Sequence, residues 1–323
     1  MGCGNEEDAN DTLDETMFGE GGVDQPTLNK TTATYTYHLP YFSGESYVAT
    51  TYSGHNAWDF NLSGTSGDGD CGEPVVAVTS GKIIGVVSTS DANCEGCTNS
   101  PGNYVKLDHD IDSNTSYYYH LRDVYVVSGQ WVQQGQALGT LGDSGNASAC
   151  HLHYEIRNSS GTQITQSTKF YFYKNGAYTS NTLSSGSTYT SYNHYIISNA
   201  ASRNGGSSKV GTATTKVAYP ADVEGEGFVM YYSGGSYGTC GIYYEAKGCK
   251  GGDFCPSYNN TNSAWLVRTG FYAWYDACGE ADTCWVGFPT GDEFSVSGGA
   301  KQTFEYGYLV YSTSTGQVTA YSY

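Results

Sequence analysis

Hydrophobic residues occur along this chain in short runs that alternate with polar residues, a period typical of β-strands. The alternation is clearest in residues 151–156, where polar and apolar residues take turns. Side chains of an extended chain point to opposite faces in turn, so one face of this predicted strand is apolar and the other polar. The polar face carries His151, His153 and Glu155. Two histidines on one face favour a shared metal or proton-transfer site, whereas the plainer alternative is polar side chains turned to water.

The same pattern recurs through the first half of the chain and predicts an all-β fold. Further strands are predicted at 73–78, 82–87, 103–107, 116–121, 124–127 and 136–138. Ser80 and Gly81 separate the first two of these, which predicts a hairpin-like pair. No long run has the 3.6-residue apolar period of a helix. We therefore expect one compact antiparallel domain, a β-sheet of the barrel or sandwich type.

Changes in composition along the 323 residues predict how the chain is organised. The first 30 residues hold eight acidic residues and almost nothing apolar, which is typical of a disordered tether. Ser, Thr, Asn and Gly dominate residues 180–217, which we interpret as a linker. Strand-like runs return at 227–232, 241–244 and 270–275. The predicted order is a tether at 1–30, a first domain at 31–179, a linker at 180–217 and a second β-rich domain at 218–323.

Composition and charge exclude some classes of partner. The net charge is -18 and only 14 residues are Lys or Arg, so the chain lacks the basic stripe that nucleic acid requires. No apolar stretch approaches the roughly 18 residues of a membrane-spanning helix. Ten cysteines, most of them in Gly-, Asn- and Ser-rich sequence, indicate an oxidising compartment rather than a set of buried thiols.

The first residues resemble the end of a bacterial lipoprotein signal. Cys3 stands in the sequence Gly2-Cys3-Gly4-Asn5, and the corresponding cysteine of those lipoproteins becomes the lipidated first residue. The resemblance implies a lipid anchor at Cys3. It also implies a location outside the cytoplasm, in the periplasm, on the outer membrane or in the medium. The alternative is an ordinary N-terminus in which the cysteine is incidental.

Two further motifs supply side chains that would complete a site with the predicted strand. Residues 55–59 read H-x-x-x-D, and residues 118–121 read Tyr-Tyr-His-Leu. His55, Asp59 and His153 would give two imidazoles and one carboxylate, which leaves the fourth position of a zinc ion open, as in catalytic zinc sites. Zn²⁺ in such a site activates water and polarises a carbonyl group. The remaining histidines, His120 and His151, would then be available to move protons.

The three motifs together resemble those of the lysostaphin-type or β-lytic zinc metalloendopeptidases, the LytM-like family, which cleave peptide bonds in bacterial peptidoglycan. That family has H-x-x-x-D, then Tyr-x-His-Leu, then H-x-H followed by an aromatic residue and Glu. The chain has the three motifs in this order, and the similarity covers roughly residues 40–165. The small residue and the proline usual before the last motif are Ala149 and Cys150 here, and the usual Phe after it is Tyr154.

The resemblance implies a zinc metalloendopeptidase that hydrolyses stem or cross-bridge peptides of the cell wall. Its zinc ligands would be His55, Asp59 and His153. His120 and His151 would steer protons and stabilise the oxyanion while an activated water attacks the scissile carbonyl. All five positions are present, which favours an active enzyme over the silent relatives that have lost ligands. We expect peptidoglycan as the partner and a monomer in solution.

Several tyrosines and histidines lie outside the three motifs. Family members often add a tyrosine hydroxyl near the first ligand, and both Tyr47 and Tyr52 are candidates. Three histidines match no motif position, and we interpret them as surface or hydrogen-bonded residues. They are His38, His109 and His194.

Cysteine pairing follows partly from the resemblance. A disulfide-bearing branch of the family has a Cys before the H-x-H and an earlier partner. The spacing of Cys94 and Cys97 also suits a redox or zinc motif, but no βαβ context or second C-x-x-C supports either. The predicted pairs are Cys71 with Cys150, Cys94 with Cys97, and Cys278 with Cys284. No pairing is predicted for the remaining Cys240, Cys249 and Cys255.

The last part of the chain, roughly 269–322, resembles an LGFP repeat, a β module attached to some cell-wall hydrolases. Residues 286–289 read Val-Gly-Phe-Pro, so Val286 replaces the leading Leu of the repeat. The resemblance implies attachment to the cell wall. The alternative is a purely structural β domain whose aromatic residues form a core.

Three functions remain open at this point. The first is a peptidoglycan endopeptidase, the second is a secreted general protease of the same fold, and the third is a catalytically silent adaptor that binds wall material. Stoichiometric zinc would distinguish the third from the other two, and product analysis would separate the first from the second.

Overall fold

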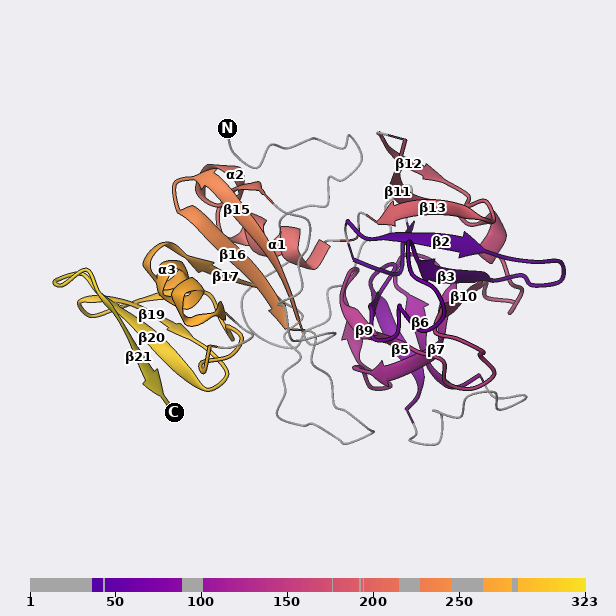
Figure 1. Cartoon of the computed structure of the whole chain (residues 1–323), viewed down its shortest axis with the longest axis horizontal. Coiled ribbons are helices and arrows are strands. Elements are labelled where there is room, and N and C mark those ends of the chain that lie inside the picture. Colours follow the sequence, from indigo (N-terminus) through magenta and orange to yellow (C-terminus); the bar gives the residue numbers. More distant parts are fainter. Residues whose placement is uncertain are drawn as a thin grey trace.

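Residues 37–191 build one large β-sheet, on the right of Figure 1. The computed structural model describes residues 37–42, 44–88, 101–175, 177–191, 193, 195–214, 227–245, 264–280 and 284–323. The elements of the large sheet and its short 3-10 helix are β1 (Tyr37–His38), β2 (Ser46–Thr50), β3 (Trp58–Leu62), β4 (Pro74–Val76), β5 (Gly81–Val87), β6 (Asn103–His109), β7 (Thr115–Val124), β8 (Trp131–Val132), β9 (Ala137–Leu141), β10 (Leu152–Arg157), η3 (Thr165–Ser167), β11 (Phe170–Lys174), β12 (Ala177–Asn181) and β13 (Ser187–Ser191).

The order of the strands puts β10 near the middle of this sheet. The path runs β1-β11-β13-β2-β3-β10-β7-β6-β5-β8, with β12 beside β11, and with β9 pairing both β4 and β7. Among the described strands the pairing is antiparallel except between β1 and β11. The predicted all-β fold class is confirmed.

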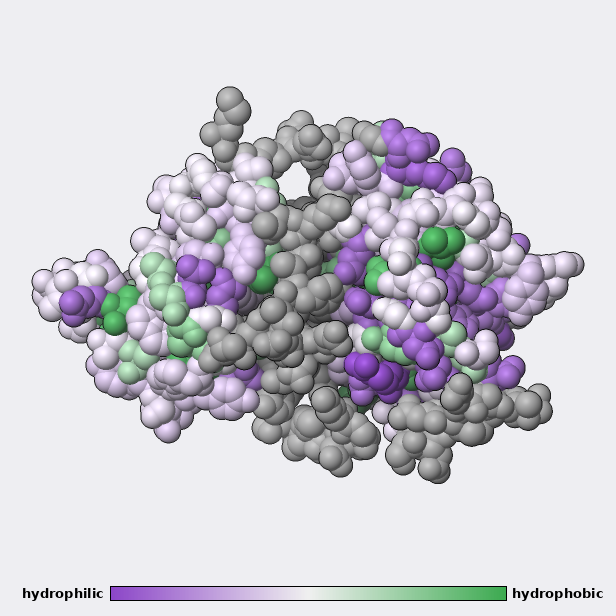
Figure 2. Space-filling model, in the orientation of Figure 1, coloured by the Kyte–Doolittle hydropathy of each residue, from purple (hydrophilic) through white to green (hydrophobic). Residues whose placement is uncertain are grey.

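One face of the sheet packs on the main hydrophobic core and the other stays accessible. Leu152, Tyr154 and Ile156 of β10 are at most 1% exposed and belong to this core, as the alternation predicts. The histidine between them, His153, is partly exposed on the opposite face. On the side of the molecule drawn in Figure 2, strongly hydrophobic residues form small separate patches. In β10, the apolar side chains therefore pack in the core, and His153 lies on the opposite face.

The predicted hairpin of 73–78 with 82–87 is wrong. β4 pairs with β9, whereas β5 pairs with β6 and β8. The backbone after β4 is already committed elsewhere, because Ala77 N donates to Gln136 O and His38 N donates to Val78 O, both at 2.9 Å. The continuous apolar run is buried within the core instead of turning back at the Ser80-Gly81 corner.

The predicted linker at 180–217 is also corrected by the structure. Its first part forms β13, which lies inside the large sheet between β11 and β2. Tyr189 and Ser191 of this strand are buried. The polar side chains have partners, since Ser191 Oγ donates to Tyr41 O at 2.6 Å and Thr190 Oγ1 lies 2.7 Å from Ser46 Oγ. A Ser- and Thr-rich strand is stable here because its hydroxyl groups are satisfied.

The described residues after 191 form two smaller sheets and their helices, on the left of Figure 1. The first consists of β14 (Gly211–Ala213), β15 (Gly227–Gly235), β16 (Gly238–Glu245) and β17 (Trp265–Arg268), with α1 (Tyr195–Arg203) and α2 (Gly206–Lys209) before it. The second consists of β18 (Phe294–Val296), β19 (Gly299–Thr303), β20 (Gly307–Ser312) and β21 (Val318–Ser322). A second β-rich region is thus present, as predicted. Because β14 pairs with β15, residues 211–213 of the predicted linker belong to this region.

The strand predicted at 270–275 is instead the helix α3 (Thr269–Cys278). Phe271 and Tyr275 are buried at a spacing of four residues, which is the period of one helical face. The helix ends at Gly279, whose φ of 101° is the left-handed conformation usual after a helix. The aromatic residues suggested a strand, but their spacing is that of a helix.

A shared hydrophobic cluster joins the large sheet to the first smaller one. Phe42, Val76 and Ala137 from the large sheet region pack with Ile197 and Tyr244 from the other side. The Tyr244 hydroxyl also accepts a hydrogen bond from Ala137 N at 3.2 Å. The two parts of the chain therefore have a common buried boundary.

Two cysteine pairs lie at disulfide distance among the described residues, Cys71 with Cys150 and Cys278 with Cys284. Both are pairs that the sequence analysis predicted. Cys240 is buried in β16. The predictions for Cys3, Cys94 and Cys97 lie outside the described residues, as do Cys249 and Cys255. Within the described ranges no helix is both long enough and apolar enough to cross a membrane.

Candidate metal centre and neighbouring histidines

The middle of the large sheet places Asp59 and His153 opposite each other. Asp59 lies on β3, His153 lies on β10, and the two residues are direct partners in the antiparallel ladder. Directly opposed residues have Cβ atoms about 4.5–5.5 Å apart and share one face. The strands are anchored on the other face by Phe60 and Tyr154, which are fully buried. The register therefore fixes the carboxylate beside the imidazole.

His55 comes from the loop before β3, and several hydrogen bonds hold this loop in place. Thr51 Oγ1 donates to His55 O at 2.7 Å, and Gln166 Nε2 donates to the same carbonyl at 2.6 Å. His55 N donates to Tyr52 O at 3.0 Å. The ring of Tyr52 stacks on the ring of His55 with a centroid distance of 4.4 Å. Hydrogen bonds to the backbone of His55 and stacking of Tyr52 on its ring thus fix the position of the imidazole.

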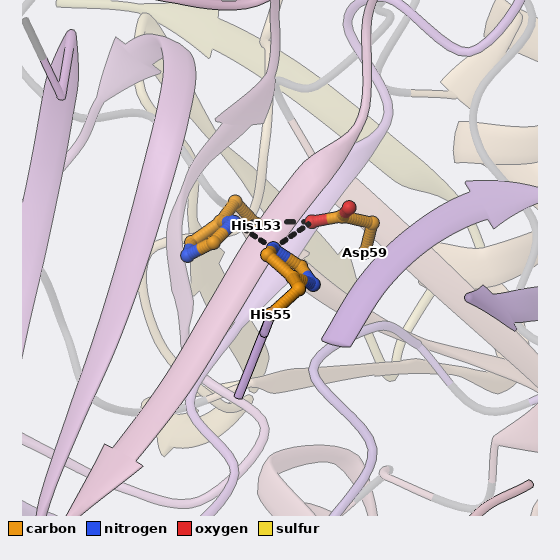
Figure 3. A group of neighbouring side chains, drawn as sticks. All are labelled: His55, Asp59 and His153. Atoms are coloured by element: carbon orange, nitrogen blue, oxygen red, sulfur yellow. Dashed lines mark hydrogen bonds and ion pairs between the residues drawn. The ribbon is translucent and has the colours of Figure 1, made fainter. Parts of the chain in front are cut away.

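The three side chains converge through one atom each, as Figure 3 shows. His55 Nε2 lies 3.0 Å from His153 Nδ1, which lies 3.1 Å from Asp59 Oδ1, and the third side of the triangle is 3.5 Å. Zinc binds such atoms at about 2.0–2.1 Å, so two ligands at the tetrahedral angle stand about 3.3 Å apart. The triangle fits three ligands of a tetrahedral ion, and the donor set is one that zinc prefers.

Contacts within the group shift the pKa values of Asp59 and His153 in opposite directions. The pKa of Asp59 is held below its usual value, because contacts with His153, His151 and His55 outweigh the burial that would raise it. Burial lowers the pKa of His153, but hydrogen bonds to Asp59 and Glu155 outweigh this effect and raise it to about 9. Asp59 is therefore charged at neutral pH, as a metal ligand must be.

A bulge in β7 decides where His120 points. Asn103 and Tyr104 are neighbours on β6, but they pair with Leu121 and Tyr119 of β7. His120 is the extra residue between these two, and its φ of 63° is the left-handed conformation that few residues other than glycine adopt. Outliers of this kind cost energy and cluster at functional sites.

The bulge brings His120 to the side of the candidate ligands. Regular alternation would direct it toward the core together with Tyr118, yet its ring lies 4.9 Å from that of His151 and 5.8 Å from that of His153. His120 Nδ1 donates to Ser144 O at 2.8 Å. Burial, followed by the nearby His151, lowers the pKa of His120 to about 4. This histidine is therefore neutral at pH 7.

His151 directly precedes β10, next to the cysteine pair. Its Nδ1 donates to Ala149 O at 2.9 Å, and its Nε2 lies 3.8 Å from Asp59 Oδ1. The pair of Cys150 with Cys71 joins this position to the loop that follows β3. His151 is thus close to the candidate ligands without being one of the three converging atoms.

The structure also distinguishes residues that the sequence left open. Tyr52 stacks on His55 and is 69% exposed, whereas Tyr47 is fully buried in the core and stacks on Tyr41. Of the two tyrosine candidates, Tyr52 is the one beside the site. His109 is buried, with hydrogen-bond partners for both ring nitrogens, which fits a structural role. His38 lies on β1, and His194 lies outside the described residues.

Two residues of the site escaped the sequence analysis, Gln166 and Ser144. Gln166 holds the His55 carbonyl from 111 residues away in the chain. Ser144 is fully buried, and its hydroxyl accepts from Asn103 N at 2.9 Å and donates to Leu121 O at 2.7 Å. Both act through backbone groups, so no motif of side chains announces them. The cluster of glycines around Ser144 was the only sequence signal.

Replacing Ser144 with alanine should destabilise the protein. The change leaves the buried Asn103 N–H without its acceptor and the Leu121 carbonyl without its donor, and one such unsatisfied group costs about 1–3 kcal/mol. We expect the free energy of unfolding in urea to fall by about that amount, whereas Ser66→Ala at an exposed serine should leave it unchanged. Equal stability of the two variants would contradict the role of Ser144 in fixing the bulge.

Comparison with known proteins identifies relatives for part of this chain. It is 47% identical over 57 residues to the peptidoglycan DD-endopeptidase ShyC of Vibrio cholerae, which covers 17% of this chain and 12% of that protein. It is 28% identical over 215 residues to the glycyl-glycine endopeptidase ALE-1 of Staphylococcus capitis, or 66% of this chain and 55% of the relative. The matches span less than two thirds of either relative.

A solved structure and a family model were also found to be similar to part of the chain. A putative peptidase M23 from Pseudomonas aeruginosa is 22% identical, with a TM-score of 0.30, over 41% of this chain and 52% of that one. The family model for peptidase family M23 matches residues 60–166, which begin directly after Asp59 and include His120, His151 and His153. This segment of the chain is therefore similar to the M23 peptidases.

Proposed function

We propose that the protein is a zinc-dependent endopeptidase that hydrolyses peptide bonds of bacterial peptidoglycan. The observation that carries the proposal is the convergence of His55 Nε2, Asp59 Oδ1 and His153 Nδ1 on the open face of the sheet. These three residues would hold the ion, and an open fourth position is what distinguishes catalytic from structural zinc sites. Bound there, zinc would supply Lewis-acid activation of water and of the scissile carbonyl.

The two other histidines are arranged to move protons. A carbonyl oxygen can only accept, so the bonds to Ser144 O and Ala149 O place the ring proton of His120 and of His151 on Nδ1. The Nε2 atom of each ring is then the nitrogen that faces the site and can exchange a proton. His120, neutral at pH 7, is suited to take a proton from the attacking water and pass it to the departing amine. His151, beside Asp59, is suited to stabilise charge that develops on the carbonyl oxygen once its Nε2 also carries a proton and can donate it.

The substrate class rests on the relatives. One relative is a peptidoglycan DD-endopeptidase and another is a glycyl-glycine endopeptidase, so peptides of the cell wall are the substrates that we propose. This substrate requires a location outside the cytoplasm. Attachment through a lipid at Cys3, wall binding by the LGFP-like part at 269–322 and a monomeric state belong to the same proposal.

A silent adaptor is the alternative that the geometry disfavours. An adaptor would need wall contacts but neither three converging ligand atoms nor a strained histidine beside them. His120 reaches its position through a bulge and a left-handed backbone conformation, which is energetically unfavourable. A surface that only binds does not require such a conformation. A general protease of the same fold would share the site and differ only in its substrate.

The proposal predicts new peptide ends when the full chain digests purified peptidoglycan. We expect the zinc-loaded protein to release fragments whose new amino termini, identified by mass spectrometry, map to one type of peptide bond. A chelator should stop the release, and added zinc should restore it. Stoichiometric zinc without any released fragment would refute the peptidoglycan substrate. Cleavage of casein but not of peptidoglycan would favour the general protease.

A further inference from the structure

Two charged side chains of β10 follow the candidate ligand His153, and each contacts the next. Its second ring nitrogen, Nε2, lies 3.2 Å from Glu155 Oε1. The other oxygen of Glu155 accepts two hydrogen bonds from Arg157, from Nε at 2.9 Å and from Nη2 at 2.7 Å. The carboxylate is thus shared between the imidazole on one side and the guanidinium on the other.

The strand itself creates this chain. Residues 153, 155 and 157 of β10 alternate onto the same face, at a spacing of roughly 7 Å for each pair of residues. The neighbouring strand β7 supplies the packing, because Tyr119 is opposite His153 and Tyr117 is opposite Glu155. The guanidinium of Arg157 lies over the Tyr117 ring, 4.8 Å from its centroid. Each polar group therefore has an aromatic neighbour that limits its movement.

The carboxylate of Glu155 is buried and therefore needs a partner of opposite charge. Glu155 is 7% exposed, and a buried carboxylate is costly unless it is paired. Arg157 supplies the compensating charge at the surface end, where its side chain is 36% exposed. Glu155 is then fixed with one oxygen directed at His153.

The consequence for His153 is chemical as well as geometric. A neutral imidazole carries one proton, and only the nitrogen without it can bind a metal. Both ring nitrogens face a carboxylate, Nδ1 that of Asp59 at 3.1 Å and Nε2 that of Glu155 at 3.2 Å. With a cation bound between Nδ1 and Asp59, the one ring proton lies on Nε2, where Glu155 accepts it and increases the basicity of the ring. Without Glu155, both tautomers of His153 would be accessible and the ring could rotate.

We propose that Glu155 and Arg157 are positioning residues, which fix the orientation and the Nε2-protonated tautomer of His153 and so determine the affinity of the site for zinc. The inference rests on the proposed function only in that His153 Nδ1 is taken as a metal ligand. It does not depend on which substrate is cleaved.

Zinc affinity of the full chain, measured by competition with a chromophoric chelator at fixed pH, tests the proposal. We expect the dissociation constant to rise about 10- to 100-fold in Glu155→Ala, which is the usual effect of removing such a partner. The rise should be smaller in Glu155→Gln and in Arg157→Met. The matched control is Arg268→Met, because Arg268 makes a similar 2.8 Å ion pair with Glu293 in another part of the protein.

Wild-type affinity in a folded Glu155→Ala variant would overturn the proposal. If that variant does not fold, as judged by circular dichroism, the isosteric Glu155→Gln takes its place, and unchanged affinity there has the same consequence. A ¹⁵N-histidine spectrum of the zinc-loaded protein gives a second readout. A proton on Nε2 of His153 is the expected result, and a proton on Nδ1 would contradict it.

The test also separates this inference from the proposed function. Protein that binds zinc, loses affinity in the Glu155 variants and yet releases no peptide would refute the hydrolase while supporting the positioning role. Equal zinc binding by wild type and His153→Ala would remove His153 from the ligands, and the inference would fall with that assignment.

Discussion

Replacing His153 or Asp59 with alanine is expected to abolish both zinc binding and hydrolysis while the fold is retained. Each change removes one of only three ligand atoms, and two protein ligands do not hold zinc against a competing chelator. The fold should survive because both side chains lie on the accessible face, at 19% and 18% exposure, and contribute nothing to the main core.

The measurement combines zinc content after dialysis, peptidoglycan digestion and thermal unfolding for each variant. His38→Ala is a suitable control, since this histidine lies on β1 at the edge of the large sheet and far from β10 in the strand order. Undiminished digestion by Asp59→Ala or His153→Ala would exclude these residues as ligands. Loss of the fold in both variants would instead give them a structural role.

Replacing His120 or His151 is expected to leave zinc bound and to reduce turnover by about 10²- to 10⁴-fold, the contribution typical of acid-base catalysis. Neither residue supplies one of the three converging atoms. Both rings lie beside these atoms, and the centroids of the two rings are 4.9 Å from each other. The contrast between His151→Ala and His153→Ala is informative because the two residues belong to the same face of one strand. Zinc lost from His151→Ala would mean that their roles are reversed.

His120 requires a second substitution because of its backbone. Alanine at a φ of 63° is strained, so His120→Ala could lower activity by relaxing the bulge. Asparagine tolerates the left-handed conformation, and His120→Asn therefore removes the imidazole while keeping the backbone. Equal losses of turnover in His120→Ala and His120→Asn would locate the effect in the ring. Full activity of His120→Asn would contradict a role in proton transfer.

Much of the candidate site could be predicted from the sequence because it depends on strand alternation. The period of residues 151–156 separated the core face from the polar face, and the structure shows the same division. Spacing alone also brought His55 and Asp59 into consideration. The assignment of ligand and proton-transfer roles remains a proposal, since it depended on the resemblance.

Other features were inaccessible because they depend on contacts distant in sequence. The bulge at His120 is a mismatch between β6 and β7, and neither strand shows it when considered alone. The strand β13 has the composition of a linker, and only its partners in β2 and β11 satisfy its hydroxyl groups. The helix α3 was misread because aromatic residues are common in strands, although its buried residues are spaced four apart.

The position of β13 has a practical consequence for work on the isolated segment that matches the M23 family. The M23 match ends at residue 166, but β13 covers β2, and Ser185 just before it exchanges two hydrogen bonds of 3.0 Å with Thr51, the residue that holds the His55 loop. A recombinant fragment cut at residue 166 would leave β2 as an unprotected edge strand, prone to aggregation. The smallest expressible fragment with an intact first ligand therefore extends at least to Ser191.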